Sequence, residues 1–354
     1  MTIFVNPAVA SLTAYVPGDQ PWEPGYIKLN TNESPFPPSP EVIEAVSRAT
    51  ALGEFNKYPD PKSKSLRHAI ARQLGFEPCQ VLAGNGSDEV LRLLCHAFLR
   101  PRSGDCIGML YPTYTLYKTL AEMFGCGCEA YQLPAPDYSM PAAAINADVK
   151  IFFIANPNPP LGILYKPGLI ANMAEVRPER LIVIDEAYAD FAGSNCLDIL
   201  NNHENVVITR TFSKSYSLAG IRVGFILAHE PIIAQLTKIK DSYNLNQLSQ
   251  KAAEAAWLSA SYYEAKNALI RENRDFLTAA IRQRGFEVPE SFGNFIFARR
   301  RDAEQLYAEL KQRKILVRYF NAPALRDGVR ITIGARKDLE SLLSAIDKID
   351  ASRA

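Results

Sequence analysis

The segment Val206-Val-Ile-Thr-Arg-Thr-Phe-Ser-Lys-Ser-Tyr-Ser-Leu-Ala-Gly-Ile-Arg222 begins as an apolar strand and continues into a small-polar loop that holds one lysine, Lys214. Ser213 and Ser215 flank this lysine, and another apolar run, Val223–Ala228, follows. A lysine at a strand end is usually a solvated charge. A lysine held in a pocket, however, loses its proton readily and forms a Schiff base with an aldehyde.

Apolar runs of the same kind recur upstream and alternate with helix-period stretches such as Asp88–Leu99 and Tyr114–Phe124. The runs are too continuous for half-exposed strands and are typical of a sheet covered on both faces. The predicted strands are Cys106–Leu110, Ile151–Ala155, Leu181–Ile184, Val206–Thr209 and Val223–Ala228. The alternation predicts an α/β fold with a mainly parallel sheet, whose ligands bind beyond the carboxyl ends of the strands.

The chain is predicted to have three parts. Residues 1–40 are rich in proline and predict an extended arm that packs with the small domain, because proline excludes long helices and central strands. Residues 41–245 form the large domain, and Ser39-Pro40-Glu41 opens its first helix with Ser39 as the N-cap. Residues 246–354 predict a small α+β domain with helices at Gln247–Ser259, Tyr262–Arg284 and Ala303–Arg313 and strands at Asn294–Ala298, Ile315–Val317 and Val329–Ile333.

Composition excludes several classes of protein. The 354 residues carry 39 Lys plus Arg and 38 Asp plus Glu, a balance that argues against a nucleic-acid or membrane-surface protein. No run approaches the ~18 apolar residues of a membrane span, and the first residues lack the pattern of a signal peptide. Of the six cysteines only Cys126 and Cys128 lie close together, and no histidine flanks them at metal-ligand spacing, so free thiols in a reducing cytoplasm are favoured over a zinc site and we expect no metal.

A carboxylate stands directly after the predicted strand Leu181–Ile184. Asp185 could simply cap the next helix. Pyridoxal phosphate chemistry offers a sharper role, because that cofactor withdraws electrons only while its ring nitrogen is protonated, and a fixed carboxylate stabilises the charge. Tyr188, three residues later, could reach the ring hydroxyl.

The segment Val81-Leu-Ala-Gly-Asn-Gly-Ser-Asp-Glu-Val-Leu91 passes from a strand through glycines into a helix that starts near Ser87. The N–H groups of a helix N-terminus bind phosphate, and Ser213 and Arg222 could complete the anion site; a plain capping turn is the alternative. The dinucleotide fingerprint GxGxxG is absent. Tyr114 follows another strand and offers a flat face to a pyridine ring, although such aromatics more often belong to the core.

These features together resemble the fold type I pyridoxal-phosphate-dependent aminotransferases, and within them the histidinol-phosphate aminotransferase family. The resemblance covers nearly the whole chain. It rests on Lys28-Leu-Asn-Thr-Asn-Glu33, Tyr58-Pro-Asp60, Ala83-Gly-Asn-Gly-Ser-Asp-Glu89, Tyr111-Pro-Thr-Tyr114, Asp185-Glu-Ala-Tyr188, Phe212-Ser-Lys-Ser215 with Leu218-Ala-Gly-Ile-Arg222, and Val329-Arg-Ile-Thr-Ile-Gly334.

The resemblance assigns a role to each of these positions. It implies catalytic roles for Lys214, Asp185 and Tyr188, with Lys214 as the Schiff-base lysine. It implies that the cofactor is also held by Ser87, Asp88, Tyr114, Asn158, Ser213, Arg222 and, across a dimer interface, Tyr58. It implies a substrate site formed by Tyr15, Asn32, Arg318 and Arg330.

One stretch departs from the family pattern. The family usually reads Asn-Pro-Asn-Asn-Pro-Thr-Gly, whereas this chain reads Asn156-Pro-Asn-Pro-Pro-Leu-Gly162. The asparagine that contacts the cofactor ring is therefore replaced by Pro159, which has no side-chain amide. Either Asn158 takes over the contact after a small backbone shift, or the contact is missing.

The implied reaction exchanges an amino group between histidinol phosphate with 2-oxoglutarate and imidazole-acetol phosphate with glutamate, in histidine biosynthesis. Because both substrates are anionic, one arginine-rich pocket could serve both. A broad-specificity aromatic aminotransferase and a phosphothreonine decarboxylase of the same fold remain alternatives, because the lysine, aspartate and phosphate cup serve the cofactor and not the substrate. The resemblance also implies a cytoplasmic homodimer that binds neither nucleic acid nor membrane.

Overall fold

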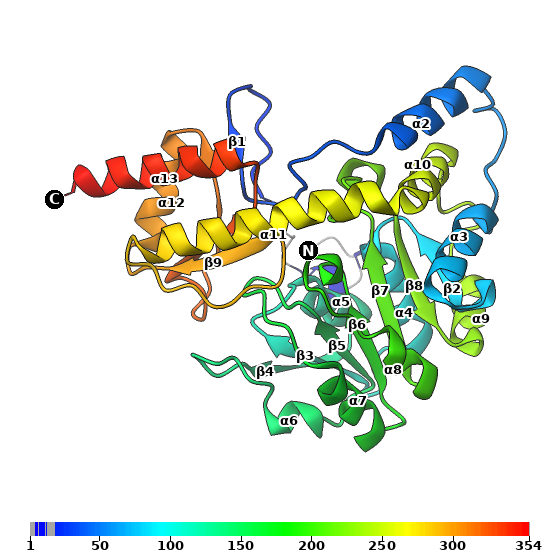
Figure 1. Ribbon diagram of the computed structural model, residues 1–354. Helices are drawn as coiled ribbons and strands as arrows, with labels where there is room; N and C mark the ends of the chain where they lie inside the picture. The colour runs from blue at the N-terminus through cyan, green and yellow to red at the C-terminus, as the bar shows by residue number, and fades with distance from the viewer. Residues whose placement is uncertain (1–3, 6, 11, 13–17, 354) are drawn as a thin grey trace.

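The computed structural model describes residues 4–5, 7–10, 12 and 18–353, and within them a sheet of seven strands forms the centre of the molecule (Figure 1). Strand β8 is antiparallel to both of its neighbours, and the other pairs are parallel. The predicted mainly parallel α/β sheet is thereby confirmed. The strands in spatial order are β2 (Val81–Gly84), β8 (Gly224–Ala228), β7 (Val206–Thr211), β6 (Leu181–Asp185), β5 (Ile151–Ala155), β3 (Cys106–Tyr111) and β4 (Gly127–Gln132).

The central strands are buried on both faces, which explains their continuous apolar sequences. Along β5, Ile151 and Phe153 belong to the apolar core on one face of the sheet, while Phe152 and Ile154 belong to the core on the other face. This alternation follows from the two-residue period of a strand. One face is covered by α4 (Ser87–Phe98), α5 (Leu116–Phe124) and α9 (Glu230–Ile239), and the other by α6 (Ala142–Ile145), α7 (Pro167–Val176) and α8 (Leu197–Asn202).

A second core lies beneath a smaller antiparallel sheet in the order β11-β12-β9. The long helix α11 (Ala260–Arg282) runs from the region of the large sheet to this core, as the yellow ribbon of Figure 1 shows. The remaining elements here are β9 (Phe295–Arg299), α12 (Ala303–Gln312), β10 (Ile315–Leu316), β11 (Arg318–Tyr319), β12 (Gly328–Thr332) and α13 (Arg336–Ala351).

The N-terminal arm is joined to this smaller part. Its strand β1 (Ile27–Lys28) pairs in parallel with β10, and the N–H of Leu29 donates to the carbonyl of Leu316 over 2.8 Å. Helix α10 (Gln247–Leu258) packs instead on α2 (Pro40–Leu52) and α3 (Lys64–Leu74), and its Trp257 belongs to the core of the large sheet. The domain boundaries at residues 40 and 245 stay a prediction.

Two local features differ from the sequence-based expectation. Helix α2 starts at Pro40 as predicted, but the Ser39 side chain makes no capping hydrogen bond; its backbone N–H donates to the hydroxyl of Tyr263 instead. Strand β4 was not predicted, because it is an edge strand with mostly exposed residues and therefore lacks an apolar run.

The short helix α1 (Pro7–Ala10) and the single turns η1 (Pro78–Gln80), η2 (Ala189–Phe191) and η3 (Ala219–Ile221) complete the described elements. Among the described residues, no helix combines the length and apolar character that crossing a bilayer requires.

Candidate active site

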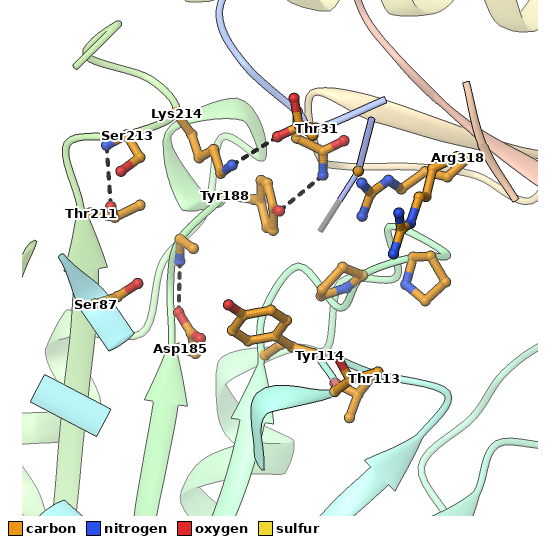
Figure 2. Close-up of a pocket in the computed structure, with 18 of the residues that line it drawn as sticks. Thr31, Ser87, Thr113, Tyr114, Asp185, Tyr188, Thr211, Ser213, Lys214 and Arg318 are labelled. Carbon is orange, nitrogen blue, oxygen red and sulfur yellow. Dashed lines mark hydrogen bonds between the residues drawn. The ribbon is translucent and has the colours of Figure 1, made fainter. Parts of the chain in front are cut away.

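A cavity of about 250 Å³ opens at the carboxyl edge of the large sheet. Residues at or after the ends of β2, β3, β5, β6 and β7 line it, together with residues 30–32 of the arm and Arg318, Phe320 and Arg330 of the smaller part. The predicted site residues that line it are Asn32, Ser87, Asp88, Tyr114, Asp185, Tyr188, Ser213, Lys214, Arg222, Arg318 and Arg330. Figure 2 shows Lys214, Tyr188, Asp185 and Tyr114 around one open space.

Lys214 enters this space from the loop after β7. Burial, aided by the positive charge of Arg330, lowers the pKa of its ammonium group to about 8. Its Nζ donates a hydrogen bond of 3.1 Å to the carbonyl oxygen of Thr31 in the arm (Figure 2). A substantial fraction of this amine is therefore neutral near pH 7.5, unlike an ordinary lysine, and the neutral amine is the nucleophile.

Asp185 is the last residue of β6, at the back of the cavity. Only 4 % of its surface is exposed, and burial raises the pKa of its carboxyl group to about 6. Its Oδ2 accepts a hydrogen bond of 2.7 Å from the hydroxyl of Tyr117, and its Oδ1 accepts one of 3.2 Å from the N–H of Ala187. A desolvated carboxylate of this kind is stabilised by any cation placed against it.

The part of the cavity lined by Ser87, Ser213 and Arg222 has the groups that bind an anion. Helix α4 begins at Ser87, and the N–H groups of its first turn have no partner within the helix. The Arg222 guanidinium donates to Ser213 Oγ over 3.2 Å and lies against Gly86, where an added Cβ would come within 2.5 Å of its Nη2. An added Cβ at Gly224 would likewise lie 2.5 Å from the backbone nitrogen of Ser87. The two glycines thus let a strand, a helix start and a guanidinium approach one another closely.

The arm connects the two parts of the molecule at the cavity. Asn32 Nδ2 donates to the hydroxyl of Tyr188 over 2.9 Å, and the Thr332 hydroxyl donates to Asn32 Oδ1 over 3.1 Å. Asn32 is in the left-handed region with a φ of 55°, a conformation that asparagine tolerates better than most residues. The Arg330 guanidinium donates to the carbonyl of Asn30 over 2.8 Å. Asn32 therefore positions Tyr188 in this structure.

Two arginines stand side by side at the mouth of the cavity. Arg318 on β11 and Arg330 on β12 are register partners, so both side chains lie on one face of the small sheet. The ring of Phe320 contacts both guanidinium groups, at 5.5 Å and 5.6 Å from its centroid. A fixed pair of guanidinium groups is suited to carboxylate or phosphate.

Two predicted site residues, Tyr58 and Asn158, do not line the cavity, and a third is not described. Tyr15 lies outside the described residues. Tyr58 is 80 % exposed and stacks on Tyr243 with 4.3 Å between ring centroids, so its predicted role across an interface stays a prediction. Asn158 is fully buried and does not line the cavity, because its Nδ2 donates to the carbonyl of Pro112 and its Oδ1 accepts from the hydroxyl of Thr113. Pro159 lines the cavity in its place.

Sequence reasoning missed several lining or supporting residues. Thr31 accepts the hydrogen bond from Lys214 through its backbone carbonyl, a group that every residue carries and that the sequence therefore cannot single out. Tyr117 lies three residues after Tyr114, and that helical spacing was the available signal. Phe320 was missed between two predicted arginines although it is the second residue after Arg318.

The fold and the site define an aminotransferase. The family model "Aminotransferase class I and II" matches residues 24–349, so the chain belongs to that family. A histidinol-phosphate aminotransferase of Geobacter sulfurreducens is 44 % identical over 347 residues, which are 96 % of this chain and 98 % of the relative. Another, of Rhodopirellula baltica, is 42 % identical and aligns with 97 % of this chain and 95 % of its own. The chain is therefore a member of the histidinol-phosphate aminotransferase family.

Solved structures agree on the fold. A crystal structure of histidinol-phosphate aminotransferase from Sinorhizobium meliloti in complex with pyridoxal-5'-phosphate superposes with a TM-score of 0.90 at 23 % identity, covering 100 % of this chain and 99 % of that one. An aspartate aminotransferase from Thermotoga maritima gives a TM-score of 0.83 at 23 % identity and covers 92 % of each chain. The predicted fold type I architecture is thereby confirmed.

Proposed function

We propose that this protein interconverts histidinol phosphate plus 2-oxoglutarate with imidazole-acetol phosphate plus glutamate, in histidine biosynthesis. The observation that carries the proposal is a single cavity that holds a low-pKa lysine, a buried carboxylate, an anion-binding helix start and two paired arginines. The membership of the chain in the histidinol-phosphate aminotransferase family supports the substrate assignment.

Pyridoxal phosphate fits the residues present. The cavity is lined by Ser87 at the start of α4, by Ser213 and by Arg222, so a phosphate bound there would meet helix N–H groups, a hydroxyl and a guanidinium. Asp185, whose carboxyl pKa is raised by burial, is suited to a protonated ring nitrogen. Lys214 would bind the aldehyde carbon through Nζ, with Tyr188 at the ring hydroxyl and Tyr114 at the ring face. When bound, the cofactor withdraws electrons from the substrate Cα and so makes its proton acidic.

The chain's own residues then hold and move protons. Lys214 Nζ, kept partly neutral by burial, takes the Cα proton as a general base and gives it up again as a general acid. The Thr31 carbonyl accepts a hydrogen bond from this nitrogen and so would orient the free amine. Asp185 stays charged because Tyr117 and the N–H of Ala187 donate to it.

Arg318 and Arg330 bind the anionic groups of the substrates. Arg330 takes the carboxylate of glutamate or the phosphate of histidinol phosphate, and Arg318 adds a second guanidinium on the same face. Asn32 contributes by holding Tyr188 toward the substrate side of the cavity. Pro159 supplies no side-chain amide there, so Tyr188 would be the residue that contacts the ring hydroxyl of the cofactor.

We also propose that the protein works as a cytoplasmic homodimer. The exposed side chains of Ile43, Leu52, Phe55 and Tyr58 support a subunit interface around α2 and the segment after it, since apolar groups of this size are usually covered. Tyr58 would then reach the partner's cofactor phosphate. Sedimentation of the purified protein tests the dimer, and Tyr58→Phe tests the contact through cofactor affinity.

A substrate panel tests the proposed reaction. Purified protein loaded with pyridoxal phosphate is assayed with histidinol phosphate, phenylalanine and phosphothreonine, each with 2-oxoglutarate as acceptor. The proposal requires kcat/KM to be highest for histidinol phosphate. Higher turnover of phenylalanine indicates an aromatic aminotransferase, and release of CO₂ from phosphothreonine indicates a decarboxylase; either result refutes the proposal.

A further inference from the structure

Tyr117 lies directly behind the carboxylate of the proposed active site, outside the cavity lining. Its hydroxyl donates to Asp185 Oδ2 over 2.7 Å, and Tyr117 is fully buried while Asp185 is 4 % exposed. A hydrogen bond to an ionised group in such a dry site is short and strong. The catalytic role already assigned to Asp185 does not account for this contact.

Packing fixes the direction of the Tyr117 hydroxyl. The ring stacks on Phe153 of β5, with 4.8 Å between centroids and 7° between planes. The same ring also meets that of Tyr114 edge-on, with 5.7 Å between centroids and 85° between planes. One aromatic side chain therefore touches both the carboxylate expected at the ring nitrogen and the tyrosine expected at the ring face.

The hydrogen bond from Tyr117 lowers the pKa of Asp185 and so opposes the effect of burial. Burial raises the pKa of Asp185, and the negative charge of Asp88 acts in the same direction, while the Tyr117 hydrogen bond is the largest opposing contribution. The pKa of Tyr117 itself is raised well above its usual value by burial and by Asp185, so the phenol stays a neutral donor at every working pH. Without this hydroxyl, Asp185 Oδ2 would lack its strongest donor and the carboxylate would hold a proton more tightly.

We propose that Tyr117 is a positioning residue of the amino-transfer site, whose hydroxyl keeps Asp185 oriented and ionised so that it stabilises a protonated pyridine nitrogen. This role rests on the proposed function, because it requires a cofactor with a ring nitrogen opposite Asp185. It differs from a packing role in one respect: its effect depends on that nitrogen atom.

The test compares Tyr117→Phe with wild type in the full-length protein. Cofactor-free protein is titrated at pH 7.5 with pyridoxal phosphate and with deazapyridoxal phosphate, in which CH replaces the ring nitrogen, and both dissociation constants are measured by absorbance. Tyr165→Phe is the matched control, because its buried hydroxyl donates to the carbonyl of Tyr138 away from the cavity. Thermal unfolding of each variant, recorded without cofactor, separates a folding defect from a binding defect.

We expect Tyr117→Phe to weaken pyridoxal phosphate binding about ten- to hundredfold, the effect of a lost hydrogen bond to a charged group. Binding of the deaza analogue should change less than about threefold, and Tyr165→Phe should leave both constants unchanged. Equal weakening of both ligands, or no weakening, overturns the role of Tyr117. Failure of the wild-type protein to bind pyridoxal phosphate would instead refute the proposed function itself.

Discussion

Gly86 provides the most quantitative test of the anion-binding end of the cavity. This residue precedes α4 with φ 81° and ψ 166°, a region of backbone conformation that is essentially restricted to glycine. In Gly86→Ala the new Cβ would lie 2.5 Å from Nη2 and 3.1 Å from Cζ of Arg222, so the guanidinium must move. The substitution therefore acts separately on the backbone and on Arg222, the arginine proposed to bind the cofactor phosphate.

The two effects have different magnitudes and different readouts. The forced backbone conformation should lower the free energy of unfolding of the cofactor-free protein by about 1–3 kcal/mol. Displacing Arg222 would remove its proposed charge-assisted hydrogen bond to the phosphate, worth about 1.5–3 kcal/mol, so the dissociation constant for pyridoxal phosphate should rise about ten- to hundredfold. Equilibrium dialysis measures the second effect, and urea unfolding measures the first.

Gly220→Ala is the matched control. Gly220 lies in the turn η3, two residues before Arg222; its φ is outside the left-handed region, and none of the atoms surveyed around an added Cβ comes within 4 Å. This variant should bind the cofactor as the wild type does. The assignment of the phosphate site to Arg222 and the start of α4 would be refuted in either of two cases. Gly86→Ala could bind pyridoxal phosphate with the wild-type dissociation constant, or Gly220→Ala could weaken that binding equally.

Three further predictions concern the amine, the substrate and the core. Because the pKa of Lys214 is lowered to about 8 and the neutral amine reacts, the rate of covalent cofactor attachment should rise with pH and level off above about 8; a rate that still climbs at pH 10 would contradict this. Arg330→Ala should raise KM for glutamate about ten- to hundredfold with a smaller change in kcat, and unchanged steady-state kinetics would remove its role. Arg210→Ala should lower the free energy of unfolding by about 3–5 kcal/mol in urea, because it leaves the buried Glu186 carboxylate without the guanidinium that donates two hydrogen bonds to its Oε2; a loss below about 1 kcal/mol would be that of a surface pair.

The large sheet was predictable because its strands are buried on both faces. Residues 151–155 and 181–184 are continuous apolar runs, and the structure places alternate residues of each run in opposite cores. Asp185, directly after such a run, and Lys214, in the short loop after another, were predictable for a related reason, since residues that follow parallel strands lie at the carboxyl edge of the sheet. The edge strand β4 escaped prediction because its exposed residues carry no such pattern.

Tertiary contacts determine what the sequence could not reveal. Asn158 has the chemistry of a ring contact, but the local loop turns its amide toward Pro112 and Thr113. The Thr31 carbonyl meets Lys214 only in the folded protein, because the two residues are 183 positions apart in the sequence. In the sequence, Tyr117 has the pattern of an ordinary buried aromatic on a helix face. Its proposed role in positioning Asp185 follows only from the hydrogen bond that the fold forms between the two residues.

The most direct test of the central claim is to locate the covalent bond between the protein and its cofactor. Protein loaded with pyridoxal phosphate is reduced with borohydride, digested and analysed by tandem mass spectrometry. The account predicts one modified site, at Nζ of Lys214, and no modification in Lys214→Arg. A cofactor found on another lysine, or no retained cofactor at all, would contradict it.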